Sequence, residues 1–360
     1  MASRIYSVIV GAGSFIPENR VANEDFLRSD FRDSNGKPFD KTNEEIISTF
    51  KAITTIEERR YSDQDMSTSE MAFLASVRAI KSSGIDSESL DYIIVAHNFG
   101  DISNGNSRLD MVPSLASRVK HKLGIVNPNT VAYDIAFGCP GWLQGFIQAD
   151  YFIRSGDAKR ALIIGAETLS RVSDPHDRDS MLYSDGAGAV ILEGRENSTP
   201  TGVLAHATRS DTLVYSQMLR MGKSFQPDPN DQEEIYLKMN GRRLYQYALE
   251  TVPMAMKACL DKTGIDIKEV KKVLIHQANG KMDDEILRRF YELYGISEIP
   301  EAVMPMTISW LGNSSVATIP TLYDLILQGK MEGHRIETND IIIFASVGAG
   351  MNINAAIYRA

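Results

Sequence analysis

The sequence is poor in cysteine, with only Cys139 and Cys259 among 360 residues, and the two occupy unlike surroundings. Two cysteines form at most one disulfide, so a disulfide-rich scaffold is excluded and a reducing compartment is favoured. Long apolar runs are also missing, which argues against a membrane-spanning helix. The opening segment, Met1–Gly13, has one basic residue and a short apolar stretch, as in a first β-strand and not a secretion signal. We therefore expect a cytoplasmic protein with no membrane partner.

Positive charge is scarce as well, since 38 lysines and arginines face 47 aspartates and glutamates, for a net charge of −9. This balance argues against nucleic-acid binding and leaves only a local basic patch for an acidic partner. No histidine–carboxylate group has the spacing of a metal site, and no phosphate-binding loop of the Walker type occurs. Gly11-Ala12-Gly13 superficially resembles a dinucleotide-binding turn, but a third glycine is missing and Pro17 interrupts the expected helix.

Apolar, β-branched runs alternate along the chain with helical stretches, which indicates an α/β fold. A chain of this length is expected to form two domains or one double-sized unit. The helices Ser69–Ser83 and Tyr245–Lys262 are each followed by a glycine suited to a left-handed cap. The clearest strand candidates are Ser7–Val10, Tyr92–Val95, Ala161–Ile164, Ala189–Leu192, Val273–Ile275 and Ile341–Phe344.

The two halves of the chain repeat the same landmarks in the same order. In each half a helix closes at a glycine and leads to an apolar strand, and a turn of small residues then opens another helix. These turns are Gly138–Gly141 in the first half and Gly312–Ser315 in the second. We therefore divide the chain into residues 1–197 and 198–360, two similar halves that would bring Cys139 and Asn313 close to one pseudo-twofold axis.

Cys139 lies where a strand turns into a helix, with Gly138 before it and Pro140 after it. Free amide groups and the positive end of the helix dipole stabilise a thiolate there, so we expect the pKa of Cys139 to be lowered. The alternative is a buried cysteine that serves as a small apolar side chain. Cys259 fits that alternative because it lies within a helical run.

Residues of the second half complete a candidate site. His276 ends an apolar strand, a position that faces the ligand crevice in α/β folds, although most single histidines are structural. Asn313 either caps a helix or joins His276 in hydrogen-bonding a developing enolate oxygen. The backbone amides of Cys139 and of Gly350, in Gly348-Ala349-Gly350, are candidates for an oxyanion hole, with a tight turn as the alternative for the glycines.

Taken together, the motifs resemble those of β-ketoacyl-acyl-carrier-protein synthase III and its relatives in the thiolase-like superfamily. The resemblance covers essentially the whole chain, and it implies a homodimer with a five-layered α-β-α-β-α fold built from the two halves. The matching segments are Gly13–Asn23, Thr54–Arg60, the nucleophile turn Asp134–Gly141, the histidine motif His276–Asn279 and the asparagine motif Gly312–Ser315.

The resemblance implies a ping-pong condensation in which Cys139 accepts an acyl group from a coenzyme A or phosphopantetheine thioester. His276 and Asn313 then bind the carbonyl of a malonyl or other β-carboxyacyl or ketoacyl thioester, and the enolate left by loss of CO₂ attacks the acyl-cysteine. No metal or redox cofactor takes part. The resemblance also implies contacts to the thioester substrate from Arg178, Gly241, Tyr245, Ala278 and Lys281.

Departures from the family pattern concern the substrate. Ile46 and Ile53 occupy the region where enzymes of primary metabolism hold the adenine end of coenzyme A with tryptophan and arginine. An extra stretch around Asp101–Asp110 precedes Val112-Pro113-Ser114, which in the family helps to close the acyl pocket of the partner subunit. We therefore expect a specialised relative that takes longer or carrier-bound acyl groups, for fatty-acid, dialkylresorcinol or other polyketide-like lipid synthesis.

A local basic patch would dock an acidic acyl carrier protein, with solvated helix charge as the alternative. Two other functions stay open. One is a non-decarboxylating acyltransferase or condensing enzyme of the same fold. The other is a non-catalytic partner subunit, against which the retention of Cys139, His276 and Asn313 argues. The residues predicted for the patch are Arg242, Arg243, Lys281, Arg288 and Arg289.

Overall fold

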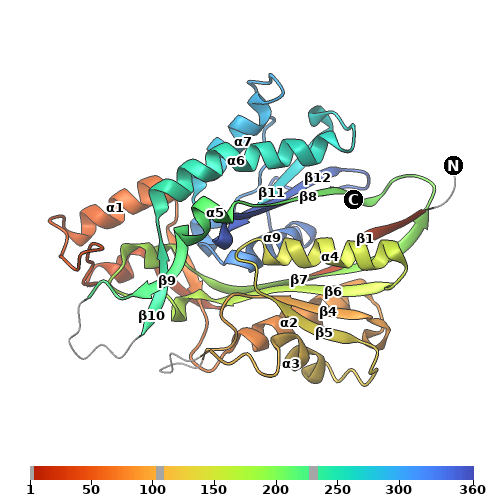
Figure 1. Cartoon of the computed structure of the whole chain (residues 1–360), viewed down its shortest axis with the longest axis horizontal. Helices are drawn as coiled ribbons and strands as arrows, with labels where there is room; N and C mark the ends of the chain where they lie inside the picture. Colours follow the sequence, from red (N-terminus) through yellow and green to blue (C-terminus); the bar gives the residue numbers. More distant parts are fainter. Residues whose placement is uncertain (1–3, 103–108, 227–233) are drawn as a thin grey trace.

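The computed structural model describes residues 4–102, 109–226 and 234–360. Helices and sheets alternate through the molecule in layers (Figure 1). Helices α6 (Gly241–Asp261) and α7 (Gly280–Glu292) cover one sheet, and α2 (Thr68–Ser83) and α3 (Leu115–Lys122) cover the other. Helices α4 (Gly141–Ser155) and α9 (Thr318–Leu327) lie between the two sheets. This arrangement confirms the predicted α-β-α-β-α fold.

Four strands of the first sheet match the second sheet in order and direction. The first sheet has the order β1-β7-β6-β4-β5, and the second has the order β11-β12-β13-β8. In these four strands one parallel pair is followed by two antiparallel pairs, so β4, β6, β7 and β1 correspond to β11, β12, β13 and β8. The first sheet has one more strand, β5, which pairs in parallel with β4. The strands of the first sheet are β1 (Arg4–Phe15), β4 (Tyr92–Ala96), β5 (Val131–Ile135), β6 (Arg160–Thr168) and β7 (Asp185–Asn197). Those of the second are β8 (Gly202–Ser210), β11 (Val270–Ile275), β12 (Ile341–Gly348) and β13 (Asn352–Arg359).

The predicted boundary at residues 197 and 198 coincides with the end of β7. Shorter elements gather at one end of the molecule, the left side of Figure 1, where α1 lies near the β9-β10 pair. Residues 103–108, inside the predicted insertion, lie outside the described residues. The shorter elements are α1 (Asn43–Thr54), β2 (Asn19–Ala22), β3 (Glu58–Tyr61), α5 (Thr212–Tyr215), β9 (Leu219–Lys223), β10 (Ile235–Met239) and α8 (Ile308–Leu311).

The glycines near the N-terminus serve packing and not nucleotide binding. Gly11 and Gly13 lie within strand β1, paired with β7. A Cβ on Gly11 would come within 2.5 Å of the Ala79 carbonyl oxygen, and one on Gly13 within 2.4 Å of the Ala79 amide nitrogen. Glycine at these positions therefore lets α2 approach β1 closely, which accounts for the motif without a dinucleotide.

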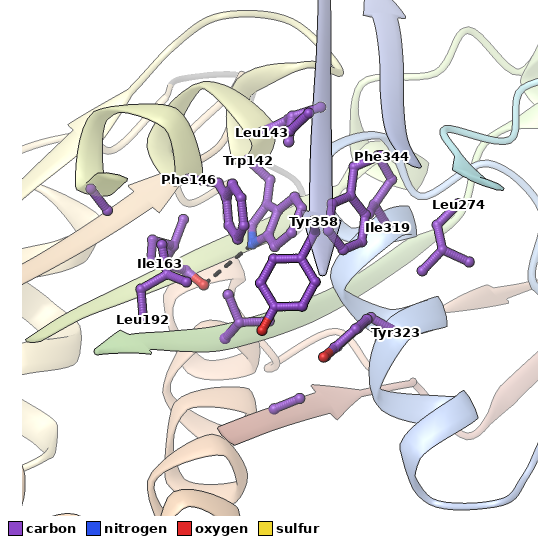
Figure 2. Close-up of a cluster of buried hydrophobic side chains, with 14 of the residues drawn as sticks. Trp142, Leu143, Phe146, Ile163, Leu192, Leu274, Ile319, Tyr323, Phe344 and Tyr358 are labelled. Carbon is purple, nitrogen blue, oxygen red and sulfur yellow. Dashed lines mark hydrogen bonds between the residues drawn. The ribbon is translucent and has the colours of Figure 1, made fainter. Parts of the chain in front are cut away.

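The central hydrophobic cluster joins the two halves. Figure 2 shows Trp142 and Phe146 of α4 beside Phe344 of β12, and the rings of Phe146 and Phe344 have centroids 5.7 Å apart. The indole nitrogen of Trp142 donates a hydrogen bond to the Ile163 carbonyl at 3.3 Å, so its burial leaves no polar atom unsatisfied. Because strands of both sheets contribute to this cluster, we expect the halves to fold as one unit.

Candidate active site

A cavity of about 1330 Å³ opens between the two halves, and Cys139, His276 and Asn313 all line it. Cys139 comes from the first half, whereas His276 and Asn313 come from the second. The three residues that the sequence predicts to be catalytic therefore line the same cavity. The turns that carry Cys139 and Asn313 correspond to each other in the internal repeat. Both contribute residues to the lining of the cavity, as the repeat predicts.

The turn that carries Cys139 depends on close contact between backbones. Gly138 has a φ of +67°, and a Cβ there would lie 2.7 Å from the Ala349 amide nitrogen. Gly348 approaches from the other side, where a Cβ would lie 2.5 Å from the Cys139 amide nitrogen. Helix α4 begins at Gly141, directly after Pro140. Two glycines therefore let the segments from the two halves meet around the thiol.

The protonation of Cys139 differs from the prediction. Burial raises the pKa of the thiol to about 11, a hydrogen bond with the Ser315 side chain opposes this, and the nearby Glu167 charge adds to it. The sequence predicts a lowered pKa from the start of α4. The difference arises mainly from the burial of the sulfur and to a lesser extent from the nearby Glu167 carboxyl, neither of which the local motif reveals. The thiol is therefore neutral at rest.

His276 follows the last residue of β11, and its backbone amide donates to the Ala345 carbonyl of β12 at 2.8 Å. The side chain is only 2% exposed, and burial lowers the pKa of His276 to about 4. Among the described residues, its Nδ1 has no hydrogen-bond partner. A neutral imidazole at this position is able to donate one hydrogen bond into the cavity without bringing a positive charge.

Gln277, the next residue, has a structural task that sequence reasoning did not assign. Its buried side-chain oxygen accepts hydrogen bonds from the backbone amides of Thr307 and Ile308, at 2.8 and 2.9 Å. Its amide nitrogen donates to the Pro305 carbonyl at 3.0 Å. Gln277 therefore fixes the segment that leads into Asn313, and so links the histidine motif to the asparagine motif.

Asn313 forms the local capping bond that is one of the two roles left open by the sequence. Its Oδ1 accepts a hydrogen bond from the Ser315 amide at 2.9 Å, which is a local capping bond. That bond fixes the orientation of the side-chain amide and leaves the Nδ2 hydrogens as donors. The Asn313 backbone forms a bridge to Tyr183, with bonds of 2.9 Å to the Leu182 carbonyl and from the Ser184 amide. The second half is thereby joined to the first at the site.

Arg59 gives the Thr54–Arg60 motif a structural role. The side chain is fully buried, and its guanidinium donates to the Met181 carbonyl at 3.0 Å and to the Asn23 side chain at 2.6 Å. Burial lowers the pKa of Arg59 to about 10. Met181 immediately precedes the segment that bridges to Asn313. The hydrogen bonds of Arg59 therefore hold that segment in place beside the site.

The segment predicted to supply an oxyanion amide follows β12. Gly348 and Ala349 are among the described residues that line the cavity, whereas Gly350 is not. Gly350 has a φ of +78° and turns the chain toward Asn352, whose side chain donates to the Ala349 carbonyl at 2.9 Å. Ala349 is therefore a further candidate for the amide role predicted for Gly350.

Four of the five residues predicted to contact substrate line the cavity: Arg178, Gly241, Tyr245 and Ala278. Lys281, the fifth, is exposed on the first turn of α7 and is absent from the described lining. Arg178 lies over the Phe39 ring at 5.1 Å, a cation–π contact.

The outer part of the cavity is apolar where the sequence departs from the family pattern. Ile46, Phe50 and Ile53 of α1 line it together with Phe39, and residues of the β9-β10 pair line the side formed by the second half. Ile53 is 50% exposed, so an apolar side chain is presented to solvent near the opening. This region offers surface for an alkyl or pantetheine chain.

Glu167 was missed by sequence reasoning, and it is buried next to the site at 1% exposure. Its Oε1 accepts a hydrogen bond from Asn98 Nδ2 at 2.5 Å, and the same nitrogen lies 3.4 Å from the Ser315 hydroxyl. Burial raises the pKa of Glu167 to about 7, against the opposing effects of His97, Asn98 and Ser315. A glutamate at the end of a strand carries no local signal for such a role, because its partners come from distant segments.

Two of the five residues predicted for the basic patch are already paired with glutamates. Arg288 is paired with Glu285 at 2.6 Å and also with Glu292, and Arg289 is paired with Glu285 at 2.7 Å. These contacts favour the alternative of solvated helix charge for both arginines. Arg242 and Lys281 are exposed, Arg242 lines the cavity, and the Arg243 guanidinium lies 6.0 Å from the centre of the Tyr215 ring.

Two kinds of structural feature are absent from the described ranges. In residues 4–102, 109–226 and 234–360, no helix has the length and apolar character needed to cross a membrane. The same part of the chain contains no group of three or more histidine, cysteine, aspartate or glutamate side chains arranged to hold a metal ion.

Comparison with known proteins identifies relatives over the whole chain. Residues 133–212 match the family described as "3-Oxoacyl-[acyl-carrier-protein (ACP)] synthase III", and residues 260–360 match its C-terminal part. The chain is 30% identical over 363 residues to the "Beta-ketoacyl-[acyl-carrier-protein] synthase III" of Xanthomonas euvesicatoria pv. vesicatoria, with 100% of both chains covered.

Solved structures of this family have the same fold as the chain. The 3-oxoacyl-[acyl-carrier-protein] synthase III of Aquifex aeolicus is 28% identical with a TM-score of 0.78, over 98% of this chain and 100% of that one. The enzyme of Thermus thermophilus is 27% identical with a TM-score of 0.80, over 98% and 99% of the two chains.

Proposed function

The chain belongs to the 3-oxoacyl-[acyl-carrier-protein] synthase III family, and from this premise we propose that Cys139 carries the acyl group of its condensation reaction. The protein is a condensing acyltransferase of lipid or polyketide-like synthesis. The observation that carries the assignment of residues is the convergence of Cys139, His276 and Asn313 on one cavity. A non-catalytic subunit would have no need of all three.

In the first half-reaction, the Cys139 sulfur attacks the carbonyl carbon of an acyl thioester. The negative charge that develops on the carbonyl oxygen is stabilised by backbone amides, for which Cys139 and Ala349 are the candidates. Collapse of the tetrahedral intermediate forms the Cys139 thioester and releases the thiol of coenzyme A or of a phosphopantetheine arm. The cavity is large enough to hold an acyl chain and a pantetheine chain together.

In the second half-reaction, His276 and Asn313 donate hydrogen bonds to the thioester carbonyl of the second substrate. The neutral state of His276 suits this role, because burial lowers the pKa of its imidazole to about 4. Loss of CO₂ from a malonyl or other β-carboxyacyl group leaves an enolate whose oxygen receives these two bonds. The enolate carbon then attacks the acyl-cysteine and forms the new carbon–carbon bond.

Release of CO₂ separates this reaction from a non-decarboxylating condensation. A malonyl thioester labelled in its free carboxyl group should yield labelled CO₂ at the same rate as condensed product. Product formation without labelled CO₂ would favour the alternative, in which the enolate forms by proton removal.

The donor is proposed to be carrier-bound, because α1 presents an apolar surface where family members of primary metabolism bind adenine. Arg178, Gly241, Tyr245 and Ala278 are positioned along the cavity to contact a pantetheine arm. The carrier protein would dock on the exposed Arg242 and Lys281 beside the opening. Since Arg288 is already paired with two glutamates, it serves as a matched control.

Charge reversal tests this docking surface. Arg242→Glu and Lys281→Glu should each raise KM for a carrier-bound donor several-fold, with little change for a small pantetheine thioester, because rim charges act mainly on encounter. Arg288→Glu should have a smaller effect. Equal effects on both donors would argue against carrier docking at this rim. Steady-state kinetics with the two donors gives the comparison.

We also propose a homodimer and a cytoplasmic, cofactor-independent enzyme. The segment that the family places at the subunit interface exposes Leu109 by 49%, Met111 by 40% and Val112 by 87%, an apolar surface suited to a second subunit. Val112→Asp should shift sedimentation toward the monomer, and an unchanged dimer would place the interface elsewhere. Full activity after chelator treatment would support independence from metal ions.

Intact-protein mass spectrometry tests the central assignment. Incubation with acyl thioesters should add the mass of one acyl group to the wild type and none to Cys139→Ala. Cys259 is fully buried in α6, so it should not be labelled. If no thioester acylates the wild type although a small alkylating agent reaches Cys139, the proposed function fails.

A further inference from the structure

Asn98 lies beside the proposed catalytic group and has no part in the reaction as derived so far. It follows β4, is half-buried, and lines the cavity together with Cys139. Its Nδ2 donates to the Ser315 hydroxyl at 3.4 Å, and the Ser315 backbone amide donates to Asn313 Oδ1 at 2.9 Å. Ser315 therefore connects Asn98 to the asparagine that is proposed to bind substrate.

The orientation of the Asn98 amide is fixed by Glu167. Asn98 Nδ2 donates to Glu167 Oε1 at 2.5 Å, and Glu167 is only 1% exposed. The oxygens of an ionised carboxyl accept hydrogen bonds and do not donate them, so the amide atom that faces Glu167 is the nitrogen. The oxygen of the Asn98 side chain therefore lies on the side away from Glu167.

The backbone around Asn98 is held in place as well. His97, which precedes it, is fully buried, and its Nδ1 accepts a hydrogen bond from the Gly100 amide at 3.0 Å. The other ring nitrogen of His97 donates to Asp134 Oδ2 at 3.0 Å. Because both its backbone and its amide group are already held, Asn98 loses little freedom when it binds a ligand.

The Oδ1 atom of Asn98 is open to the cavity. No described backbone or side-chain group donates a hydrogen bond to this oxygen, and it is not among the atoms that are buried without a partner. Since Asn98 lines the cavity, the space in front of the oxygen belongs to that cavity. The hydrogen bond to Glu167 also polarises the amide, which strengthens its oxygen as an acceptor. Asn98 therefore offers a substrate a fixed acceptor and no donor.

We propose that Asn98 Oδ1 accepts a hydrogen bond from a hydroxyl on the β-carbon of the acyl group that Cys139 takes up, an inference that rests on the proposed function. The enzyme would then select β-hydroxyacyl thioesters. An acceptor held in this orientation attracts an O–H group, whereas it repels the lone pairs of a keto oxygen at the same position. Asn98 is in this sense a specificity-determining residue, and Glu167 is the residue that positions it.

The chemistry of condensation indicates where such a substrate comes from. A condensation of this class leaves a keto group on the β-carbon of its product, and reduction of that ketone gives a β-hydroxyl. Carbonyl reduction is therefore the class of reaction that must supply the substrate. The α-carbon and the thioester carbonyl separate the β-carbon from the Cys139 sulfur, so a β-hydroxyl binds a different part of the cavity wall from the carbonyl oxygen.

Acylation of Cys139 by three pantetheine thioesters, β-hydroxyoctanoyl, β-oxooctanoyl and octanoyl, tests the inference. The hydroxyl probe should acylate the wild type about 10- to 100-fold faster than either of the others, because a polar site rejects analogues that leave it unpaired. Asn98→Leu should abolish this preference. Gln246→Leu is the matched control: Gln246 is an exposed amide that also lines the cavity, and its replacement should leave the preference unchanged.

Glu167→Gln provides a readout that a merely structural role would not move. Two facing amides pair equally well in either orientation, so Asn98 would become free to turn its Nδ2 toward the cavity. The preference for the hydroxyl probe over the keto probe should then fall, mainly because acylation by the keto probe becomes faster. A damaged fold would slow all three probes and would not speed up any of them.

A double variant covers the case in which Asn98→Leu alone fails to fold. Asn98→Leu leaves the buried Glu167 carboxyl without its Asn98 partner, whereas Asn98→Leu combined with Glu167→Leu replaces both partners by apolar groups, an exchange that is often nearly neutral for stability. The double variant should lose the preference for the hydroxyl probe to the same extent.

The results that would overturn the inference differ from those that would overturn the proposed function. Equal acylation of the wild type by all three probes, or a preference that survives in Asn98→Leu, would exclude the role of Asn98 while leaving Cys139-dependent acylation intact. An equal loss with all three probes in Asn98→Leu would mean that Asn98 binds the pantetheine arm that they share, which also excludes it. If no acyl thioester acylates the wild type, the proposed function itself fails.

Discussion

Burial away from water shifts the pKa values of Cys139, His276 and Glu167. The charged forms of these groups differ in sign. Burial disfavours whichever form is charged, so it raises the pKa of the thiol and the carboxyl and lowers that of the imidazole. The resting site therefore contains a neutral nucleophile and a neutral hydrogen-bond donor. The negative charge that develops on the substrate oxygen during the proposed reaction would be stabilised by the fixed donors of the site.

The lowered pKa of His276 predicts a pH dependence of stability. The unfolded chain protonates this histidine near pH 6.5, whereas the folded protein does so only near pH 4. Between these values the unfolded state binds more protons, so the contribution of neutral His276 is present above pH 6.5 and is lost as the pH falls. Relative to His276→Asn, the wild type should lose on the order of 3 kcal/mol of unfolding free energy across this window. Urea titrations at several pH values measure it, and a constant difference would contradict the burial of the imidazole.

At the scale of elements, the site depends on how closely backbone segments approach one another. Gly138 and Gly348 allow the turn before α4 to meet the end of β12 and the segment after it, and in each case the nearest atom to an added Cβ is a backbone nitrogen. Strand β1 and helix α2 use Gly11 and Gly13 in the same manner. In each case a single methyl group would separate elements that must touch.

Gly138→Ala tests this dependence, with Gly84→Ala as its matched control. Both glycines have nearly the same φ, +67° and +69°, so both variants carry the backbone penalty of about 1–2 kcal/mol. Only at Gly138 would the new Cβ meet another backbone, since nothing lies within 4 Å at Gly84. Gly138→Ala should be destabilised by a further 1–3 kcal/mol or so and should lose acylation. Equal effects in chemical denaturation, with acylation retained by both, would show that the turn is free to relax.

At the scale of the whole molecule, the two halves share a core and a catalytic cavity. The cluster in Figure 2 contains residues of α4 and β6 from the first half and of α9, β12 and β13 from the second. The bridge between Tyr183 and Asn313 joins the halves again beside the cavity. The site therefore exists only when the halves are assembled.

Phe344→Ala should destabilise the whole molecule. Its ring is fully buried among Trp142, Phe146, Tyr323 and Tyr358, so truncation should cost about 3–5 kcal/mol. Because the cluster spans both halves, unfolding should remain a single transition by circular dichroism and by tryptophan fluorescence. Leu213→Ala, at a side chain that is 97% exposed, should change the unfolding free energy by less than about 0.5 kcal/mol. Two separate transitions would contradict a shared core.

Much of this protein was predictable from local patterns. Apolar runs located β4, β6 and β11, because each is buried on both faces and reads as continuous apolar sequence. The internal repeat predicted two similar halves with Cys139 and Asn313 close together, and the strand end and the family resemblance added His276 to them. These features depend on neighbours in the sequence or on a repeated unit, so one sequence reveals them.

Only the tertiary structure decided the features that arise between distant segments. Glu167, Asn98 and Ser315 come from separate elements, and their sequence positions do not predict that Asn98 hydrogen-bonds both of the other two side chains. The raised pKa of Cys139 depends on burial and on that carboxyl, which outweigh the local effect of the helix start. Ala349 became a candidate for the oxyanion amide only because the turn after β12 places it in the lining of the cavity. Local sequence determined the elements and the reactive groups, whereas packing determined their protonation, because solvation and charge are set by what lies nearby in space.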